Sequence, residues 1–587
     1  MIGRRPRLTK RRVAWLVGWS ALAVVGIGIL WLVVSSMIAR SRLSELRAEL
    51  PQLREAISQG QFDRAQALAH RIEDHAHAAR ELTTGPVWWV AANVPVLGTP
   101  LRTGRVVSAE TDRLAQQVIP SVLDLAHGLT QGTLVAKDTV DLATLRRLAP
   151  QLAAAARAAR LATEHVEASP ASWSQPVADA RTQFVSELRQ LRGELSGADR
   201  AVRLLQPMLG ESGPKRYFVG FLNEAESRGV GGLPGAFAIV TADHGHIVFR
   251  HFGSDVELAS VRARASLGRD FDARYRQDDP QGVIANSDIS PEFSYAARIW
   301  AGMWQAKTGQ RIDGALAVDP TALSYLLRVT GPATLPGGEQ VSAGNVVGLT
   351  QQWQYAKYPA YTPQGNLARK KYLTSIAEAA SARITAGGDP TQLVGALTQS
   401  ARERRLVVWS ADPQVQHELD VAGWSGSVQP ADGARAGFVV VNAAGSKLDY
   451  YLGRSMTWTQ SQCGQSSSAV ATLRLRNDAP TKGLPPYVTI RADQQRGAKP
   501  GDNRLLVSFY APAGARIVDV RLDGRPVRFG VQTEAGSIVT TLDVELPRQS
   551  ARTISVTATG AVFADRVGVL EQPLVQPIQV STRRGGC

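Results

Sequence analysis

The most unusual polar stretch of the chain lies at residues 223–235, between two apolar runs that are typical of strands. It contains two acids, four glycines and Arg228. Glycines let a backbone approach a ligand closely, exposed amides can hold an anion, and an arginine can bind phosphate in a bidentate manner. The stretch has neither the Gly-Lys-Ser/Thr end of a Walker loop nor a G-x-G-x-x-G fingerprint. The alternative is a tight connection between strands, in which Arg228 pairs with Glu224 or Glu226.

Charged residues farther along the chain have simple structural explanations. Asp319 directly precedes Pro320 and most simply caps the helix that follows. Arg369, Lys370 and Lys371 form a basic cluster on a predicted helix, and such clusters are usually solvated faces. The sequence shows no Ser-His-Asp order, G-x-S-x-G elbow or H-E-x-x-H spacing. No reaction is therefore named by a motif, and no metal site is predicted from the residues.

The composition excludes several classes of protein. The chain has 587 residues, of which 44% are hydrophobic and 20% charged, so it can form several folded domains. Its two cysteines exclude a disulfide-dense scaffold and a Cys-rich zinc module. The net charge of +15 is carried mainly by arginine, since ten of the 66 basic residues are Lys and 56 are Arg. This excess indicates either solvated faces or attraction to anionic envelope material, and no platform for nucleic acid is visible.

The N-terminus predicts a membrane anchor. Residues 1–12 carry six basic residues and no acid, and residues 13–39 then run for 27 positions without a charge. About 20 apolar residues cross the hydrocarbon core, whereas a cleavable signal peptide has an apolar region of only about 7–15 residues. We therefore expect a cytoplasmic basic tail at 1–12 and a transmembrane signal-anchor helix at 13–39. The protein would cross the cell membrane once, with its bulk extracytoplasmic.

Three regions with different periodicities follow the expected anchor, and together they predict a multidomain α+β protein. Residues 40–212 show helical periodicity and indicate a bundle or stalk. Residues 213–440 alternate strands with helices, as in an α/β domain. Residues 441–587 show short alternating strands, which favour a β-sandwich, and residues 447–452 are expected to form its first strand.

The helical region is interrupted at residues 85–98, which read GPVWWVAANVPVLG. This segment is apolar, but it is broken by Pro and Gly and is too short to span a bilayer. Two explanations stay open. The segment is either a connector buried in the helical core or a segment that dips into the outer leaflet, where tryptophan is common.

The two cysteines, Cys463 and Cys587, predict one disulfide. Outside the cytoplasm thiols meet an oxidising environment, and an even pair without metal partners most simply forms a bond. The loop closed has 124 residues (587 − 463). The alternative is two free or intermolecular thiols.

Several motifs together resemble a bacterial domain-of-unknown-function family, number 4012. They are the anchor, GPVWWVAANVPVLG, YFVGFLNEAESRGVGGLPGAFAIV, IDGALAVDPTALSYLLRVTGPATLP, LVVWSADPQVQ and KLDYYL. The resemblance covers residues from about 40 to 455. Because the family name carries no activity, it implies an architecture and not a function.

The order of elements in residues 217–387 is similar, more distantly, to the LytR-CpsA-Psr family. Members of that family are membrane-anchored enzymes that move a glycopolymer from a polyprenyl-pyrophosphate carrier to the cell wall, using Arg, Asp and a divalent metal. The resemblance implies that Arg228, Asp255, Asn286 and Arg369 lie near the pyrophosphate, metal or carrier. It implies Mg²⁺ only if the protein is such a transferase.

These observations lead to one expected function and one alternative. We expect a membrane-anchored extracytoplasmic cell-envelope protein that binds a lipid-linked or wall glycopolymer through residues 213–440, with or without phosphotransferase activity. The possible partners are the cytoplasmic membrane and a polyprenyl-phosphate-linked glycan or wall polymer. The alternative is a non-catalytic structural or interaction protein of the envelope, which docks partners through its β-sandwich.

Overall fold

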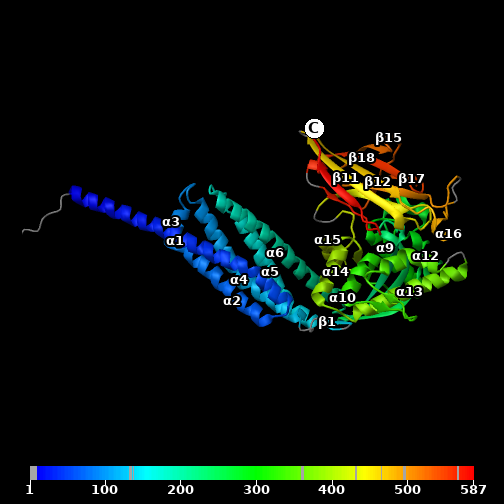
Figure 1. Ribbon diagram of the computed structural model, residues 1–587, viewed down its shortest axis with the longest axis horizontal. Coiled ribbons are helices and arrows are strands. Elements are labelled where there is room, and N and C mark those ends of the chain that lie inside the picture. Colours follow the sequence, from blue (N-terminus) through cyan, green and yellow to red (C-terminus); the bar gives the residue numbers. More distant parts are fainter. Residues whose placement is uncertain are drawn as a thin grey trace, which may run out of the picture. The chain divides into compact units, whose positions relative to one another are not determined.

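The chain forms a multidomain α+β protein with two compact units (Figure 1). The computed structural model describes residues 10–586, except 131–134, 137, 359–361, 430–432, 464–465, 494–496 and 565–566. The first unit comprises residues 1–134 and 141–203, and the second comprises residues 135–140 and 204–587. The division at 203/204 lies nine residues before the boundary expected at 212/213 (212 − 203).

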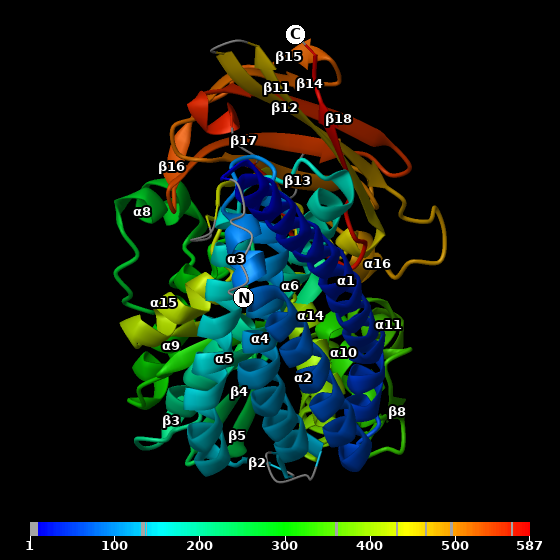
Figure 2. The same cartoon turned by 90° about the vertical axis from the view of Figure 1, so that its left-hand side faces the viewer.

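The first unit is helical, as its periodicity predicts. It consists of α1 (Lys10–Ser58), α2 (Phe62–Thr84), α3 (Pro86–Ala92), α4 (Thr99–Thr130), α5 (Leu142–Ala168) and most of α6 (Gln175–Met208). Long helices run beside one another in Figure 2, and their contacts are made mainly by alanine and leucine. One core joins α1, α2 and α4 around Leu53, Leu68 and Ile72, and another joins α4, α5 and α6 around Ala159 and Leu188. Alanine at these positions lets the helix axes approach closely.

The first helix is the apolar one. Its segment from Val24 to Ile57 is long and apolar enough for a membrane span or a signal sequence. Large apolar side chains on its N-terminal half, such as Ile27 and Met37, are exposed. Its C-terminal half packs instead against α2 through Leu46 and Leu53. One helix therefore has an uncovered apolar part followed by a packed part.

The second unit contains a seven-stranded, half-barrel sheet. The strand order is β1-β2-β5-β4-β3-β6-β9, with β1 (Val135–Ala136), β2 (Thr139–Val140), β3 (Lys215–Arg228), β4 (Gly231–Asp243), β5 (His246–Ser254), β6 (Gly314–Val318) and β9 (Leu406–Ser410). Strands β3 and β6 are parallel, and the other neighbouring pairs are antiparallel. The turn predicted between β4 and β5 is confirmed, since His244 and Gly245 both have the positive φ that a tight hairpin needs.

Ten helical segments of the described part of the second unit lie before, between or after the strands of this sheet. They are α7 (Asp255–Leu258), α8 (Arg269–Tyr275), α9 (Phe293–Thr308), α10 (Pro320–Thr330), α11 (Val346–Gly348), the π-helical turn η3 (Leu349–Trp353), α12 (Gln354–Lys357), α13 (Pro363–Thr385), α14 (Pro390–Arg402) and α15 (Pro413–Ala422). Shorter elements are β7 (Ala333–Thr334), β8 (Gln340–Val341), η1 (Arg276–Asp278) and η2 (Ile284–Asn286). Trp300 of α9 packs on Phe218 of β3 in one core, whereas α13 contacts β4 and β5.

The stretch 223–235 is a hairpin of two strands, and the expectation of a glycine loop is wrong. Strand β3 continues to Arg228 and β4 begins at Gly231, so only two residues connect them. Register shifts at Phe221/Leu222 and between Asn223 and Ser227 bend β3. Bulges of this kind re-aim side chains, and they allow an acid-rich sequence to continue a strand.

The glycines of this hairpin serve internal contacts. A Cβ on Gly229 would lie 2.2 Å from the backbone carbon of Ser290, and one on Gly232 would lie 2.3 Å from the backbone of Asn223. A side chain at either position would therefore displace the neighbouring backbone. The glycine pattern is explained by this close backbone approach.

Two sheets form the C-terminal part and share one core (Figure 1). The first has the order β16-β17-β13-β10-β19, with β16 (Gln532–Glu534), β17 (Ser537–Leu546), β13 (Asn503–Ala511), β10 (Arg435–Asn442) and β19 (Gly568–Val569). The second has the order β15-β14-β18-β12-β11-β20, with β15 (Arg525–Pro526), β14 (Arg516–Leu522), β18 (Ala551–Thr559), β12 (Ser466–Asn477), β11 (Leu452–Cys463) and β20 (Gln579–Arg584). Turns η4 (Asp449–Tyr451) and η5 (Ala561–Ala564) and helix α16 (Pro486–Thr489) lie between strands.

The strand predicted at residues 447–452 is wrong for most of its length. Asp449–Tyr451 is a 3₁₀ turn, and β11 begins only at Leu452. The buried carboxylate of Asp449 accepts hydrogen bonds from the Ser227 backbone N–H at 2.8 Å and from Asn503 Nδ2 at 2.6 Å. These bonds hold the segment in a turn, and the apolar pattern alone could not reveal them.

The predicted disulfide stays a prediction, because Cys587 and the side chain of Cys463 lie outside the described part of the structure. The strands that lead to the two cysteines support the pairing, because they run side by side. Strand β20 pairs with β11 in parallel up to Gln460 and Arg584, and these two residues are 124 positions apart (584 − 460), as the two cysteines are.

We expect non-reduced and reduced peptide maps to differ by one linked peptide that joins Cys463 to Cys587. A disulfide that closes a loop of this length is worth roughly 4–5 kcal/mol in the chain-entropy model. Complete alkylation of both thiols without reductant, in protein isolated from the envelope, would contradict the pairing.

Candidate functional site

The candidate site is built around a buried ion triad at the end of β3. Glu226 Oε1 accepts a hydrogen bond of 2.9 Å from Arg228 Nη2, and Glu226 Oε2 accepts one from Lys447 Nζ. All three residues are buried. Burial alone would raise the pKa of Glu226, but the adjacent Lys447 and Arg228 hold that pKa below its ordinary value. Glu226 is therefore a carboxylate whose charge both cations share.

Arg228 is held by internal contacts. Its Nε donates to the Ala285 carbonyl at 2.7 Å, and its Nη1 donates to the Ser227 carbonyl at 2.9 Å. With Glu226, these acceptors occupy three sides of the guanidinium. The pairing of Arg228 with a nearby glutamate, which was the structural alternative, is thus what this structure shows.

Arg369 lies against two neighbouring tyrosine rings, whose centroids are 5.9 Å apart. Its guanidinium carbon is 5.5 Å from the ring centroids of Tyr355 and of Tyr487. Lys447 Nζ is also 5.5 Å from the Tyr487 centroid, so one ring faces two cations. Cation–π contact of this kind stabilises a charge that burial removes from water.

The hydrogen bonds of Arg369 leave one donor over. Nη1 donates to Gln354 Oε1 at 3.1 Å, and Nη2 donates to Asn366 Oδ1 at 2.8 Å. Among the described residues, Nε of this buried arginine has no hydrogen-bond partner. A buried unsatisfied donor is costly, so donation from Arg369 Nε to an acceptor group of a ligand would be favourable.

The next residue, Lys370, pairs with Asp255. Lys370 Nζ donates to Asp255 Oδ2 at 2.6 Å, and Asp255 Oδ1 accepts from the Val256 backbone N–H at 3.0 Å. Burial lowers the pKa of Lys370, and the charge of Asp255 opposes this shift. The basic cluster predicted as a solvated face is therefore mixed, because Arg369 and Lys370 are buried and only Lys371 is exposed.

A cavity of about 120 Å³ opens beside these cations. It is bordered by the π-helical turn η3, by α12, by the segment that carries Lys447, and by residues 483–488. Lys447, Tyr355, Gln351, Gln352 and the half-exposed Trp353 line it. π-helical turns are rare and occur often at functional sites.

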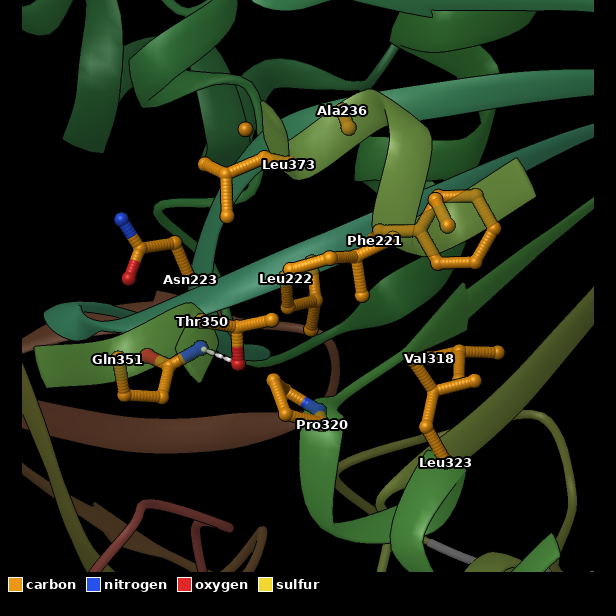
Figure 3. A pocket seen from close by; sticks show the side chains of 13 residues that line it. Phe221, Leu222, Asn223, Ala236, Val318, Pro320, Leu323, Thr350, Gln351 and Leu373 are labelled. Carbon is orange, nitrogen blue, oxygen red and sulfur yellow. Dashed lines mark hydrogen bonds between the residues drawn. The ribbon is translucent and has the colours of Figure 1, made fainter. Parts of the chain in front are cut away.

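A second, apolar cavity lies between the sheet and the helices α10 and α13 (Figure 3). Its volume is about 30 Å³, which is room for about two water molecules. Leu222 and Phe221 of β3 lie among Leu373, Leu323 and Val318 in the figure. In this structure the cavity is too small for a lipid chain.

Two of the four residues implied by the distant resemblance, Arg228 and Arg369, are linked by a series of side-chain contacts. Arg228 reaches Lys447 through Glu226, and Lys447 reaches Arg369 through the Tyr487 ring. Asp255 is joined to Arg369 through its neighbour Lys370. Asn286 follows the carbonyl that Arg228 binds, and its own Nδ2 donates to the Asp278 carbonyl at 2.7 Å.

Three members of the site were missed from the sequence, namely Lys447, Tyr355 and Tyr487. None of the four implied residues lines the 120 Å³ cavity, whereas Lys447 and Tyr355 do. Lys447 stands in KLDYYL, which was predicted as a strand and as part of a resemblance but not as part of a site. Tyr487 follows a Gly-Leu-Pro-Pro run that reads as a loop, so it gave no signal of its own.

A buried acid pair lies beside the triad. Asp319 caps α10 as predicted, since its Oδ1 accepts from the Ala322 backbone N–H at 2.7 Å. Arg405 Nη1 lies 2.7 Å from Asp319 Oδ2 and 3.6 Å from Glu224 Oε1. Burial, and then the charge of Asp319, raise the pKa of Glu224 well above its ordinary value, and Arg405 opposes this only in part. The fold thus favours the protonated form of the Glu224 carboxyl group.

Comparisons with known proteins identify part of the chain. Residues 212–355 match the family described as "Protein of unknown function (DUF4012)". This confirms the first resemblance over those residues, which include β3, β4 and η3. No curated protein matches the chain. The comparisons give no support to the resemblance with the LytR-CpsA-Psr family, which stays a hypothesis.

Two solved structures show only slight likeness to this chain. One is a nutrient-binding protein of Legionella pneumophila, with 8% identity and a TM-score of 0.15, where the match covers 22% of this chain and 44% of that one. The other is an M1 zinc metallopeptidase of Deinococcus radiodurans, with 16% identity and a TM-score of 0.11, covering 19% and 20%. At these scores neither protein informs the fold or the function.

The pKa of Glu224 predicts how stability depends on pH. The pKa of Glu224 is higher in the folded state than the ordinary pKa of glutamate, about 4.3. Between these two pKa values the folded protein binds a proton that the unfolded chain releases. The free energy of unfolding therefore falls as the pH rises through this range. Glu224→Gln cannot titrate. We expect its urea midpoint to rise relative to wild type as the pH increases above the ordinary pKa of glutamate.

The matched control is Glu378→Gln, because Glu378 is an exposed acid on α13. Its midpoint should keep a constant offset from wild type over the same range. An equally constant offset for Glu224→Gln would show that Glu224 is ionised in the folded protein, and would contradict the assignment.

Proposed function

We propose that this protein is a membrane-anchored, extracytoplasmic protein of the cell envelope, and that its second unit binds a phosphate-bearing glycopolymer or the polyprenyl pyrophosphate that carries it. The single observation that carries the proposal is the buried Lys447 in the wall of a cavity of about 120 Å³, where it shares the Tyr487 ring with the buried Arg369. The anchor and topology rest on the basic tail at 1–12 and the uncharged segment at 13–39.

The charge balance of the site supports an anionic ligand. The cations are Arg228, Arg369, Lys370 and Lys447, and the acids that pair with them are Glu226 and Asp255. Among the groups that form these ion pairs, the cations outnumber the acids by two, while Asp278 and Asp288 also lie near Arg228. A buried excess of cations attracts a phosphate group, which can accept several charge-assisted hydrogen bonds.

The cavity wall supports a ligand that carries polar groups beside its charge. Gln351, Gln352 and the tyrosines can exchange hydrogen bonds with hydroxyl groups, and Trp353 offers an exposed ring. Gln352 Nε2 already donates to Tyr451 OH at 3.0 Å across the cavity. A sugar phosphate combines the charge and the hydroxyl groups that such a wall can bind.

The geometry favours binding over group transfer. A LytR-CpsA-Psr transferase would use arginines to stabilise the charge on the departing pyrophosphate. Here Arg228 is engaged by Glu226 and by carbonyls, and Asp255 is engaged by Lys370. Among the described residues, no group of three His, Cys, Asp or Glu side chains is placed to hold a metal ion. The donors that the transferase would offer to Mg²⁺ therefore do not fit here, and no catalytic step is derived.

We expect full-length protein in detergent to bind polyprenyl pyrophosphate, with inorganic pyrophosphate as a competitor. Arg369→Gln and Lys447→Gln should each weaken binding about 10- to 100-fold, because a hydrogen bond to a charged group contributes roughly 1.5–3 kcal/mol. Trp353→Ala, at an exposed wall position, should also weaken binding while leaving the fold intact. Calorimetry with and without Mg²⁺ measures each affinity.

The matched control is Lys371→Gln, which removes a positive charge two positions from Arg369 on an exposed face of α13. Its affinity should equal that of wild type. Equal losses for Lys371→Gln and Arg369→Gln would show a non-specific charge effect and contradict the site. Absence of binding by wild type would favour the alternative of an interaction protein that docks through its C-terminal sheets.

A further inference from the structure

The short helix α3 has two unlike faces. Trp88 and Ala92 are buried, and Trp88 Nε1 donates a hydrogen bond of 2.8 Å to Ser35 Oγ of α1. On the other face Trp89 is 57% exposed, and Val90 is exposed beside it. The segment therefore fixes itself to α1 with one face and leaves an apolar face uncovered. The buried face agrees with a connector packed against the helices, and the insertion into the outer leaflet stays a prediction.

The uncovered apolar surface continues into the turn that follows α3. Val96 is 72% exposed and Leu97 is exposed next to it. Trp173, which precedes α6 and is 63% exposed, donates to the Leu97 carbonyl at 3.4 Å. Within the turn the Gly98 backbone N–H donates to the Val94 carbonyl at 2.9 Å. An apolar turn with internally paired backbone groups is compatible with a lipid environment.

The contacts of α3 with helix α1 indicate how far this surface would reach into a membrane that α1 spans. Ser35 lies four residues before Ala39, the outer end of the uncharged segment 13–39 (39 − 35). A Cβ on Gly28 would lie 3.8 Å from Val87 Cγ1, so α3 also reaches a point eleven residues before that end (39 − 28). At about 1.5 Å per residue this is about 16 Å, roughly half of a hydrocarbon core of about 30 Å.

We propose that residues 86–97 and Trp173 insert into the outer leaflet beside α1, where acyl chains cover Trp89, Val90 and Val96. This inference rests on the proposed membrane anchor. The occupant is lipid because the surface lies level with the part of α1 that itself exposes large apolar side chains. Residues 85–98 also contain no charged residue, and tryptophan is enriched where acyl chains meet head groups.

Insertion gives α3 a role in orienting the protein. A single helix can tilt and rotate in a bilayer, whereas a second apolar element fixed to it by the Ser35–Trp88 hydrogen bond resists both motions. The segment would thus hold the helical unit at a defined angle and height on the membrane surface.

Site-specific photocrosslinking of the full chain in native membranes tests this inference. The variants are Val96→p-benzoylphenylalanine, Met37→p-benzoylphenylalanine and Gln61→p-benzoylphenylalanine, made one at a time. Met37 is exposed on the apolar part of α1, and Gln61 is exposed just beyond the far end of that helix. Ser58 ends α1 23 residues after Ser35 (58 − 35), a distance of about 35 Å along the axis.

We expect phospholipid adducts at positions 37 and 96. At position 61 we expect no more phospholipid adduct than the background level. Adducts at 37 but not at 96, or a protein adduct at 96, would overturn the insertion while leaving the anchor intact. Absence of phospholipid adducts at both positions 37 and 96 would overturn the anchor and the insertion together. Equal lipid adducts at all three positions would contradict the proposed depth.

Discussion

The second unit depends on the buried carboxylate of Glu226. A carboxylate removed from water is costly unless it is paired, and this one is paired twice, with Arg228 of its own strand and with Lys447 more than 200 residues away. Removal of one partner from a buried ion pair typically costs about 3–5 kcal/mol, because the other charge is left unpaired. The pairing therefore ties the end of β3 to the segment that leads into β11.

Neighbouring contacts strengthen the same junction. Asp449 binds the Ser227 backbone and Asn503, and Gln572 Nε2 donates to the Arg228 carbonyl at 2.6 Å. The half-barrel sheet and the C-terminal sheets are thus joined by polar bonds at the tip of one hairpin. The cavity lies at this junction, where a cation already buried for structural reasons can also attract an anion.

Much of the architecture could be predicted from periodicity, and the site could be predicted only in part. The apolar helix, the helical region, the β3–β4–β5 meander and the strand-rich C-terminus follow local patterns that sequence displays directly. The bulged part of β3 does not follow such a local pattern. Its two acids, Glu224 and Glu226, are tolerated in a buried strand because Arg405 and Lys447 reach them from distant segments. Arg369 was implied by a resemblance, but its tyrosine partners come from two other short helices, α12 and α16. Long-range pairings of this kind have no local signature.

The structure of the full-length protein with bound inorganic pyrophosphate tests the central claim most directly. The account predicts density for the anion in the cavity beside η3, within hydrogen-bond distance of Lys447 Nζ, with Arg369 Nε or a cavity-wall amide as a further donor. Glu226 should remain paired with Arg228 in that structure. An empty cavity at saturating pyrophosphate, or an anion bound elsewhere on the second unit, would contradict the account.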